Sequence, residues 1–343
     1  MSERGGAFGA CVDGAGEARA SRRPLVVKIG SSTLTTADNR IDRAYLRQVA
    51  DQIARVRAAG WSPIIVTSAA IACGLEALGM ERRPGDMPSL QAAASVGQSA
   101  LSAAYAEAFA PHGVVTSLVL LTRRDTADRT AYLHARDTFD RLLDLGVVPI
   151  VNENDTVSVE QIRFGDNDTL AGMLASITDS RLTVILTTEQ GLRERNEDGT
   201  LGKRISVVKE LSESVRAMAG GTDNSEFSIG GMSSKLHAAE IVTAAGEYLW
   251  IAALEKVLAG EDIGTVFLPR ARRIPGRKRW ISFFSRVSGS LLVDEGAAKA
   301  VREQGRSLLP SGVKFVSGAF KRGDTVEISG PDGVPFARGL VNF

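Results

Sequence analysis

Hydrophobic and polar positions follow two alternating patterns between residues 25 and 252. Short apolar runs, which are typical of buried strands in a parallel sheet, are separated by longer stretches with apolar residues at helical spacing. This order predicts an α/β fold, a three-layer α/β/α sandwich with a mostly parallel sheet. The expected strands are Leu25–Ile29, Pro63–Thr67, Val114–Leu121, Val147–Val151, Leu182–Thr187 and Tyr248–Ala252.

The amphipathic stretches predict the helices that connect these strands. Asp42–Ala59, Thr130–Leu145 and Met232–Ala245 each place apolar residues on one helical face. Charges of both signs alternate within Arg129–Asp140, which predicts a solvated helix face. The tryptophans, Trp280 among them, are expected to pack.

The pattern changes near residue 262. Residues 261–276 contain glycine, prolines and clustered arginines without periodicity, and they predict a linker after a first domain at 24–260. Beyond it, short β-rich runs separated by glycine turns predict a small β-rich barrel at 277–343. Its expected elements are the strands Ser290–Val293, Val313–Val316, Asp324–Ile328 and Phe336–Val341 and a helix at Gly296–Gln304.

Composition agrees with a soluble globular protein of two domains. The 343 residues exceed the roughly 150 typical of one domain, and 44% are hydrophobic and 24% charged. The net charge of +1 gives no overall basic excess that would favour nucleic acid as partner, and we expect no membrane insertion. Residues 1–23 lack the apolar core of a signal peptide, and Asp13 and Glu17 argue against a transit peptide, so we expect a mobile tail.

Metal and disulfide chemistry is not expected. Cys11 and Cys73 cannot build a disulfide framework, which favours a reducing cytoplasm. His112, His134 and His237 are scattered, so we expect no metal site made by protein side chains.

Two of the predicted strands end in residues that could bind anions. Lys28 precedes a Gly-Ser-Ser turn, and Ser68 follows the second strand; ligands bind at this edge of open α/β sheets. Lys28 could supply a point charge for phosphate, and Ser68 could present its hydroxyl to a carboxylate. The alternatives are a solvent-exposed lysine and a plain helix N-cap.

The segment between Asn152 and Asp168 is rich in acids and amides. Carboxylates crowded in one crevice repel one another and need cations or donors nearby. Asp155 could take an α-ammonium group, Asn167 could donate to a carboxylate or accept from an ammonium, and Asp168 could orient lysines. An Asx-rich loop with a helix cap is the alternative.

A glycine pair precedes the last helix of the first domain. Gly230 and Gly231 lie just before Met232, and Lys235 lies about one turn inside the helix. Such a backbone can cradle phosphate while the lysine follows the transferred group. A helix cap with an exposed lysine is the alternative.

Taken in order, these motifs resemble those of the glutamate 5-kinase family. The resemblance covers residues 25–343 and rests on VVKIGSSTL, VTSAAIACG, QAAASVGQ, LLTRRD, ARDTF, VPIVNENDTVSVEQIRFGDND and GGMSSKLHAA. The C-terminal part is similar to a PUA domain through RKRWI, LLVDEGAAKAV, SLLPSGV and GAFKRGDTV. The resemblance implies an amino-acid kinase fold followed by a PUA-like domain.

The activity implied by this resemblance is transfer of a phosphoryl group from ATP to the γ-carboxylate of L-glutamate, the first step of proline biosynthesis, with Mg²⁺ on the ATP phosphates. It also implies a homo-oligomer, dimer or tetramer, and L-proline as feedback inhibitor; a PUA domain raises RNA as a partner. By resemblance, the catalytic residues are Lys28, Asp168 and Lys235, and the substrate-binding residues are Ser68, Asp155, Asp166 and Asn167. The nucleotide-binding residues are Lys28, Thr187, Thr188, Ile229, Gly230, Gly231, Met232, Ser233, Ser234 and Lys235.

Three positions depart from the family pattern. Ala69 replaces a glycine, Thr188 an aspartate and Ile229 a threonine. Two hypotheses follow from them. One is a working glutamate 5-kinase with altered ATP affinity, and the other is a kinase-fold protein with weakened or lost catalysis that senses an amino acid or RNA.

Overall fold

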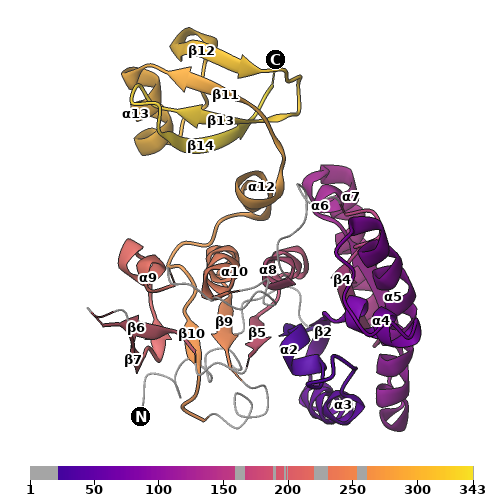
Figure 1. Ribbon diagram of the computed structural model, residues 1–343. Coiled ribbons are helices and arrows are strands. Elements are labelled where there is room, and N and C mark those ends of the chain that lie inside the picture. Colours follow the sequence, from indigo (N-terminus) through magenta and orange to yellow (C-terminus); the bar gives the residue numbers. More distant parts are fainter. Residues whose placement is uncertain are drawn as a thin grey trace. The chain divides into compact units, whose positions relative to one another are not determined.

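The computed structural model describes residues 22–158, 167–187, 191–196, 198, 200–219, 231–252 and 261–342. Contacts divide the chain into two compact units, one of Met1–Arg123 with Leu133–Ile274 and one of Arg124–Tyr132 with Pro275–Phe343. Figure 1 shows the elements of both units. None of the described helices is both long and apolar enough to span a membrane.

An eight-stranded sheet forms the centre of the first unit, in the order β3-β4-β2-β1-β5-β9-β10-β8. Neighbouring strands are parallel except for β9 and β10, which are antiparallel. The strands are β1 (Pro24–Ile29), β2 (Ser62–Val66), β3 (Thr116–Leu121), β4 (Val148–Glu153), β5 (Leu182–Leu186), β8 (Val207–Val208), β9 (Tyr248–Ile251) and β10 (Thr265–Phe267).

The expected strands of the first unit are confirmed, and each boundary lies within two residues of its expected place. The structure adds two strands at one edge of the sheet, β8 and β10, that the sequence did not predict. Strand β10 lies inside residues 261–276, where the pattern indicated a linker. A strand this short carries no periodic pattern, and its antiparallel place beside β9 depends on partners distant in sequence. Two strands of a separate ladder, β6 (Arg193–Arg195) and β7 (Leu201–Arg204), were missed as well.

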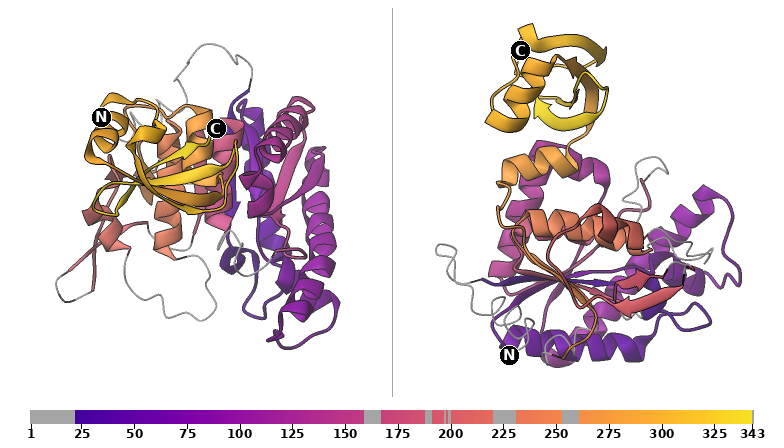
Figure 2. Two further views of the ribbon diagram at one scale, coloured as in Figure 1. Left: turned by 90° about the horizontal axis from the view of Figure 1, so that it is seen from above. Right: turned by 90° about the vertical axis from the view of Figure 1, so that its left-hand side faces the viewer.

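Helices cover both faces of the sheet (Figure 2). Leu25, Val27 and Ile29 of β1 belong to a buried core shared with the helices α3, α4 and α5. Because side chains alternate along a strand, Lys28 points to the opposite face, where α8 lies against β1 and α10 lies against α8. The helices named here are α3 (Arg43–Ala58), α4 (Ala70–Ala77), α5 (Met87–Phe109), α8 (Asn167–Thr178) and α10 (Met232–Ala244); the unit also holds α2 (Ser31–Leu34), α9 (Glu213–Met218), the short η1 (Ala110–His112) and most of α7 (Arg129–Asp144).

Two glycines bring α4 and α5 into close contact. A Cβ at Gly97 would lie 1.7 Å from the carbonyl oxygen of Ala70, and one at Gly74 would lie 1.8 Å from that of Ala93. Only glycine permits this approach of the two backbones. The contact fixes the start of α4 directly after the carboxyl end of β2.

The second unit contains a four-stranded sheet in the order β12-β11-β13-β14. The four strands and one helix expected from the sequence are all present, so the small β-rich domain is confirmed. Their bounds are β11 (Val287–Val293), α13 (Glu295–Gln304), β12 (Val313–Gly318), β13 (Thr325–Ser329) and β14 (Pro335–Leu340), with α12 (Gly276–Arg279), η3 (Trp280–Phe284) and η4 (Pro310–Gly312) beside them.

Residues from within the expected first domain belong to this second unit. Helix α6 (Arg123–Ala127) and the start of α7 supply them, and the indole Nε1 of Trp280 donates to the carbonyl oxygen of Thr126 at 3.0 Å. The guanidinium of Arg129 lies 5.2 Å from the ring centre of Tyr132 and 5.4 Å from that of Trp280. The prediction of a solvated face was wrong for Arg129, because its aromatic partner Trp280 is far away in sequence.

Candidate active site

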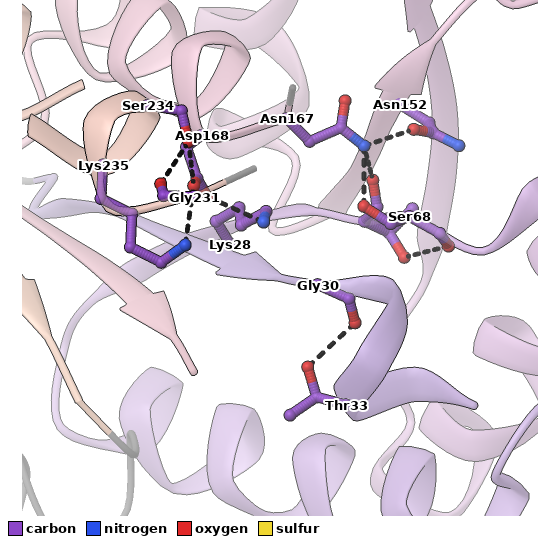
Figure 3. A network of polar contacts seen from close by, with 11 residues as sticks. Lys28, Gly30, Thr33, Ser68, Asn152, Asn167, Asp168, Gly231, Ser234 and Lys235 are labelled. Atoms are coloured by element: carbon purple, nitrogen blue, oxygen red, sulfur yellow. Dashed lines mark hydrogen bonds and ion pairs between the residues drawn. The ribbon is translucent and has the colours of Figure 1, made fainter. Parts of the chain in front are cut away.

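Three charged side chains meet at the carboxyl end of β1, and we call Lys28, Asp168 and Lys235 the charged triad (Figure 3). The Nζ of Lys28 lies 2.7 Å from Oδ1 of Asp168, and the Nζ of Lys235 lies 3.2 Å from Oδ2. Asp168 is 0% exposed and the lysines are 7% and 8% exposed. One carboxylate therefore holds two largely buried ammonium groups.

Three different elements deliver the triad. Lys28 comes from β1, Asp168 from the first turn of α8, and Lys235 from the first turns of α10. Ser234 joins it, because its hydroxyl lies 3.1 Å from Oδ2 of Asp168 and 2.8 Å from the carbonyl oxygen of Gly231, and its one proton is shared between these two acceptors. Gly231 is the N-cap of α10, so the triad lies at the start of that helix.

The electrostatics of the triad leave a positive site. Burial alone would raise the pKa of Asp168, but the ammonium groups of Lys28 and Lys235 outweigh it and hold that pKa below its ordinary value. With Asp168 ionised, the three groups carry a net charge of +1. A buried positive charge beside a helix N-terminus favours an anion such as a phosphoryl group.

A second cluster lies beside the triad and contains no charged side chain; we call Ser68, Asn152 and Asn167 the amide cluster (Figure 3). The Nδ2 of Asn167 lies 2.9 Å from Oγ of Ser68 and 3.0 Å from Oδ1 of Asn152, and it also donates to the carbonyl oxygen of Thr67. These acceptors identify the NH₂ end of the amide. Its Oδ1 points away from them, where it can accept from an ammonium group.

The structure speaks against one of the two roles considered for Ser68, the plain helix N-cap. Helix α4 has Ala69 as its N-cap residue, and no side chain caps it. The hydroxyl of Ser68 instead accepts from Asn167. Ala69 adopts φ 74° and ψ 11°, the left-handed conformation in which a Cβ is unfavourable. This conformation turns the chain from β2 into α4 at the position where Ser68 meets Asn167.

The turn after β4 is held by side chains that the sequence did not single out. The Nε2 of Gln98 donates to the carbonyl oxygen of Glu153 at 3.2 Å, and the hydroxyl of Ser158 donates to Oε1 of Glu153 at 2.6 Å. Asp155 is half-buried within this turn. An uncharged glutamine in the middle of α5 gives no sequence signal for such a role, since its partner lies on β4.

The structure describes only some of the other expected site residues. Thr187 directly follows β5, and Met232 and Ser233 lie with Ser234 in the first turn of α10. Asp166, Thr188, Ile229 and Gly230 lie outside the described residues. Among the described residues, no three histidine, cysteine, aspartate or glutamate side chains come together as metal ligands.

Comparisons with known proteins agree with this architecture. Residues 23–252 match the family model described as "Amino acid kinase family", and residues 289–343 match the model described as "PUA domain". The chain is 42% identical over 331 residues to "Glutamate 5-kinase" of Moorella thermoacetica, covering 94% of this chain and 86% of that protein. It is 44% identical over 328 residues to "Glutamate 5-kinase" of Anaeromyxobacter dehalogenans, covering 93% and 86%.

A solved structure shares the fold of the first unit. The chain is 17% identical to the carbamate kinase from Giardia lamblia bound to AMP-PNP, with a TM-score of 0.53, covering 73% of this chain and 99% of that one.

Proposed function

The chain belongs to the amino acid kinase family, in its glutamate 5-kinase group, and from this we propose that it transfers the terminal phosphoryl group of ATP to the γ-carboxylate of L-glutamate. The products are γ-glutamyl phosphate and ADP. The observation that carries the proposal is the charged triad, a buried positive site at a helix N-terminus, lying beside the amide cluster.

The triad supplies charge neutralisation for the transfer. A γ-carboxylate oxygen attacks the terminal phosphorus, and the bond from that phosphorus to the bridging oxygen of ADP breaks. The ammonium groups of Lys28 and Lys235 offset negative charge on the transferring group, and Asp168 fixes their positions. The attacking carboxylate is already ionised near neutral pH, because glutamate side chains have a pKa of about 4.3. The site therefore needs no general base.

The nucleotide is proposed to lie along Thr187 and the start of α10, where Gly231, Met232, Ser233, Ser234 and Lys235 are described; Thr188, Ile229 and Gly230 were assigned to the same side by resemblance. Backbone N–H groups at a helix start suit phosphate oxygens.

Mg²⁺ is proposed to accompany ATP. Mg²⁺ usually keeps several waters and binds through substrate phosphates with few carboxylates. No protein side chain is therefore named as a Mg²⁺ ligand in this proposal. Bound Mg²⁺ would supply further neutralisation of phosphate charge.

Glutamate is proposed to bind on the amide-cluster side. The Oδ1 of Asn167 faces away from its own partners and accepts from the α-ammonium group, with Asp155 as counter-charge. Ser68 presents its hydroxyl to a substrate carboxylate, and Asp166 was assigned to this side by resemblance.

The remaining expectations stay predictions. The resemblance predicts assembly into a homo-oligomer, inhibition by L-proline and RNA binding by the PUA domain. The sequence pattern and composition predict a cytoplasmic location and domain limits at 24–260 and 277–343. The sensor hypothesis is less favoured, because Lys28, Asp168 and Lys235 are all retained and lie in contact.

Trapping with hydroxylamine tests the proposal. The chain is incubated with ATP, Mg²⁺, glutamate and hydroxylamine, and γ-glutamyl hydroxamate is measured. Hydroxamate that depends on both ATP and glutamate is expected. Its absence at high concentrations of protein and ATP would overturn the kinase assignment, and a rise in melting temperature with glutamate but not ATP would favour the sensor.

A further inference from the structure

A buried carboxylate closes the turn that carries Asp155. Glu153 is the last residue of β4 and is 8% exposed, and Ser158, 3% exposed, donates to its Oε1 at 2.6 Å. Such a short O–H to carboxylate bond is of the charge-assisted kind, about twice as strong as a bond between neutral groups. The two residues enclose Asn154, Asp155, Thr156 and Val157 between them.

The same turn is tied to its surroundings at both ends. The N–H of Asn154 donates to the carbonyl oxygen of Leu121 on β3 at 2.9 Å, which extends the sheet by one residue. The N–H groups of Val157 and Ser158 donate back to the carbonyl oxygen of Asn154 at 3.2 and 3.1 Å. Backbone hydrogen bonds therefore set the direction in which the turn leaves the sheet, and the turn is closed both by the backbone bonds to Asn154 and by the side chain of Glu153.

Helix α5 buttresses the closed turn. Gln98 donates to the carbonyl oxygen of Glu153 at 3.2 Å, and Gln91, two turns earlier, donates to that of Ser158 at 3.3 Å. The two glutamines lie seven residues apart, so they share one helix face. They hold the backbone at Glu153 and at Ser158, the two residues whose side chains are hydrogen-bonded.

We propose that Glu153 is a positioning residue for substrate binding, whose carboxylate accepts from Ser158 and so fixes the turn that presents Asp155 to the α-ammonium group of glutamate. This inference rests on the proposed function. Glu153 acts through Asp155 and does not itself touch the reacting atoms. Loosening the turn should therefore weaken glutamate binding while leaving phosphoryl transfer, which depends on the charged triad, largely intact.

Steady-state kinetics of Ser158→Ala and Glu153→Gln test this role. Losing a hydrogen bond to a charged group costs on the order of tenfold in an equilibrium, so Ser158→Ala is expected to raise KM for glutamate about tenfold with kcat within about threefold. Glu153→Gln keeps an oxygen acceptor without its charge, so a smaller rise of about threefold is expected. KM for ATP should not change in either variant. The double variant should be no worse than Ser158→Ala, because both changes act on the same hydrogen bond.

Two controls separate positioning from plain stability. Ser158→Thr keeps the hydroxyl and should restore KM for glutamate. Ser180 is also buried, but its hydroxyl donates to the carbonyl oxygen of Leu182 at 2.7 Å, at the amino end of β5. Ser180→Ala should lower the melting temperature without changing KM for glutamate.

The results that would overturn the inference are equally definite. An unchanged KM for glutamate in Ser158→Ala and Glu153→Gln, or an equal rise in Ser180→Ala, contradicts it. If Ser158→Ala does not fold, Glu153→Gln measured beside Ser158→Thr decides. A wild-type chain that forms no hydroxamate contradicts the proposed function itself, and with it this inference.

Discussion

The charged triad and the amide cluster begin at neighbouring residues of one helix and use opposite chemistry. Asp168 holds two ammonium groups by charge, whereas Asn167, one position earlier on α8, binds three neutral acceptors. The attraction between two charges depends on distance and not on angle, so it persists through the changing geometry of phosphoryl transfer. A neutral amide depends on direction and suits the fixed orientation of a substrate. From this comparison we propose that the triad governs turnover and the amide cluster governs substrate affinity.

The largest effect is expected for Asp168→Asn. The variant leaves two buried ammonium groups without their counter-charge, so they repel each other and move apart. We expect kcat to fall by about 10²–10³-fold, as for loss of other transition-state stabilising groups, with KM for glutamate within about threefold. Hydroxamate kinetics measure both values.

Asp179→Asn is the matched control for that change. Asp179 also pairs with a cation, Arg273 at 2.6 Å, but it is solvent-exposed. It directly follows the C-terminal end of α8, the helix that begins with Asn167 and Asp168. Its kcat should equal that of the wild type. If Asp168→Asn weakened glutamate binding but left kcat unchanged, the proposed role of the triad in turnover would be refuted.

The next largest effect is expected for Asn167→Asp. A carboxylate there would face Oγ of Ser68, Oδ1 of Asn152 and a carbonyl oxygen, where an NH₂ group now donates. The cluster would open, and KM for glutamate should rise by about 10–100-fold, the cost of one or two lost hydrogen bonds, with a smaller change in kcat. Asn196→Asp, at an exposed site, should change neither. A variant that loses kcat but keeps its glutamate KM would remove the distinction between the two clusters.

Acid stability should also separate the two clusters. The folded-state pKa of Asp168 is depressed, so its contribution to stability is present above its unfolded pKa of about 3.9 and is lost as pH falls through the folded value. Asn cannot titrate. Urea unfolding between pH 6 and pH 2.5 should show a steeper loss for the wild type below about pH 4 than for Asp168→Asn. Parallel curves would show that the ion pairs contribute no net stability.

The smallest effect is expected for Ala69→Gly. Ala69 holds φ 74°, and a left-handed residue with a Cβ costs roughly 1–2 kcal/mol, so glycine should raise the free energy of unfolding by about 1 kcal/mol. Ala70→Gly, in the first turn of α4, should lower it instead. An Ala69→Gly variant no more stable than the wild type would mean that the glycine's greater unfolded-state entropy offsets the relief.

Sequence found the triad and most of the amide cluster because their residues end strands or begin helices. Lys28, Ser68 and Lys235 stand next to small residues where the apolar pattern stops, and that position alone suggests ligand contact. Gln98 and Ser158 gave no such signal. Their role arises from one hydrogen bond each to Glu153, and partners separated in sequence cannot be paired by spacing.

The same reason explains what was missed in the fold. Long buried strands carry their own pattern, and β1 was found within one residue at its start. Strand β10 is three residues long and exists through its pairing with β9. Arg129 lies in a stretch whose alternating charges are typical of a solvated helix, yet its guanidinium lies over the ring of Trp280.

Oxygen tracing tests the central claim most directly. L-Glutamate labelled with ¹⁸O in both γ-carboxylate oxygens is incubated with the chain, ATP, Mg²⁺ and hydroxylamine, and the released phosphate is analysed by mass spectrometry. A carboxylate oxygen that attacks phosphorus stays on the phosphate when hydroxylamine displaces it from carbon. We predict one ¹⁸O in each phosphate released, matched by γ-glutamyl hydroxamate. Phosphate without ¹⁸O would show that ATP reacts with water, and would contradict phosphorylation of glutamate at this site.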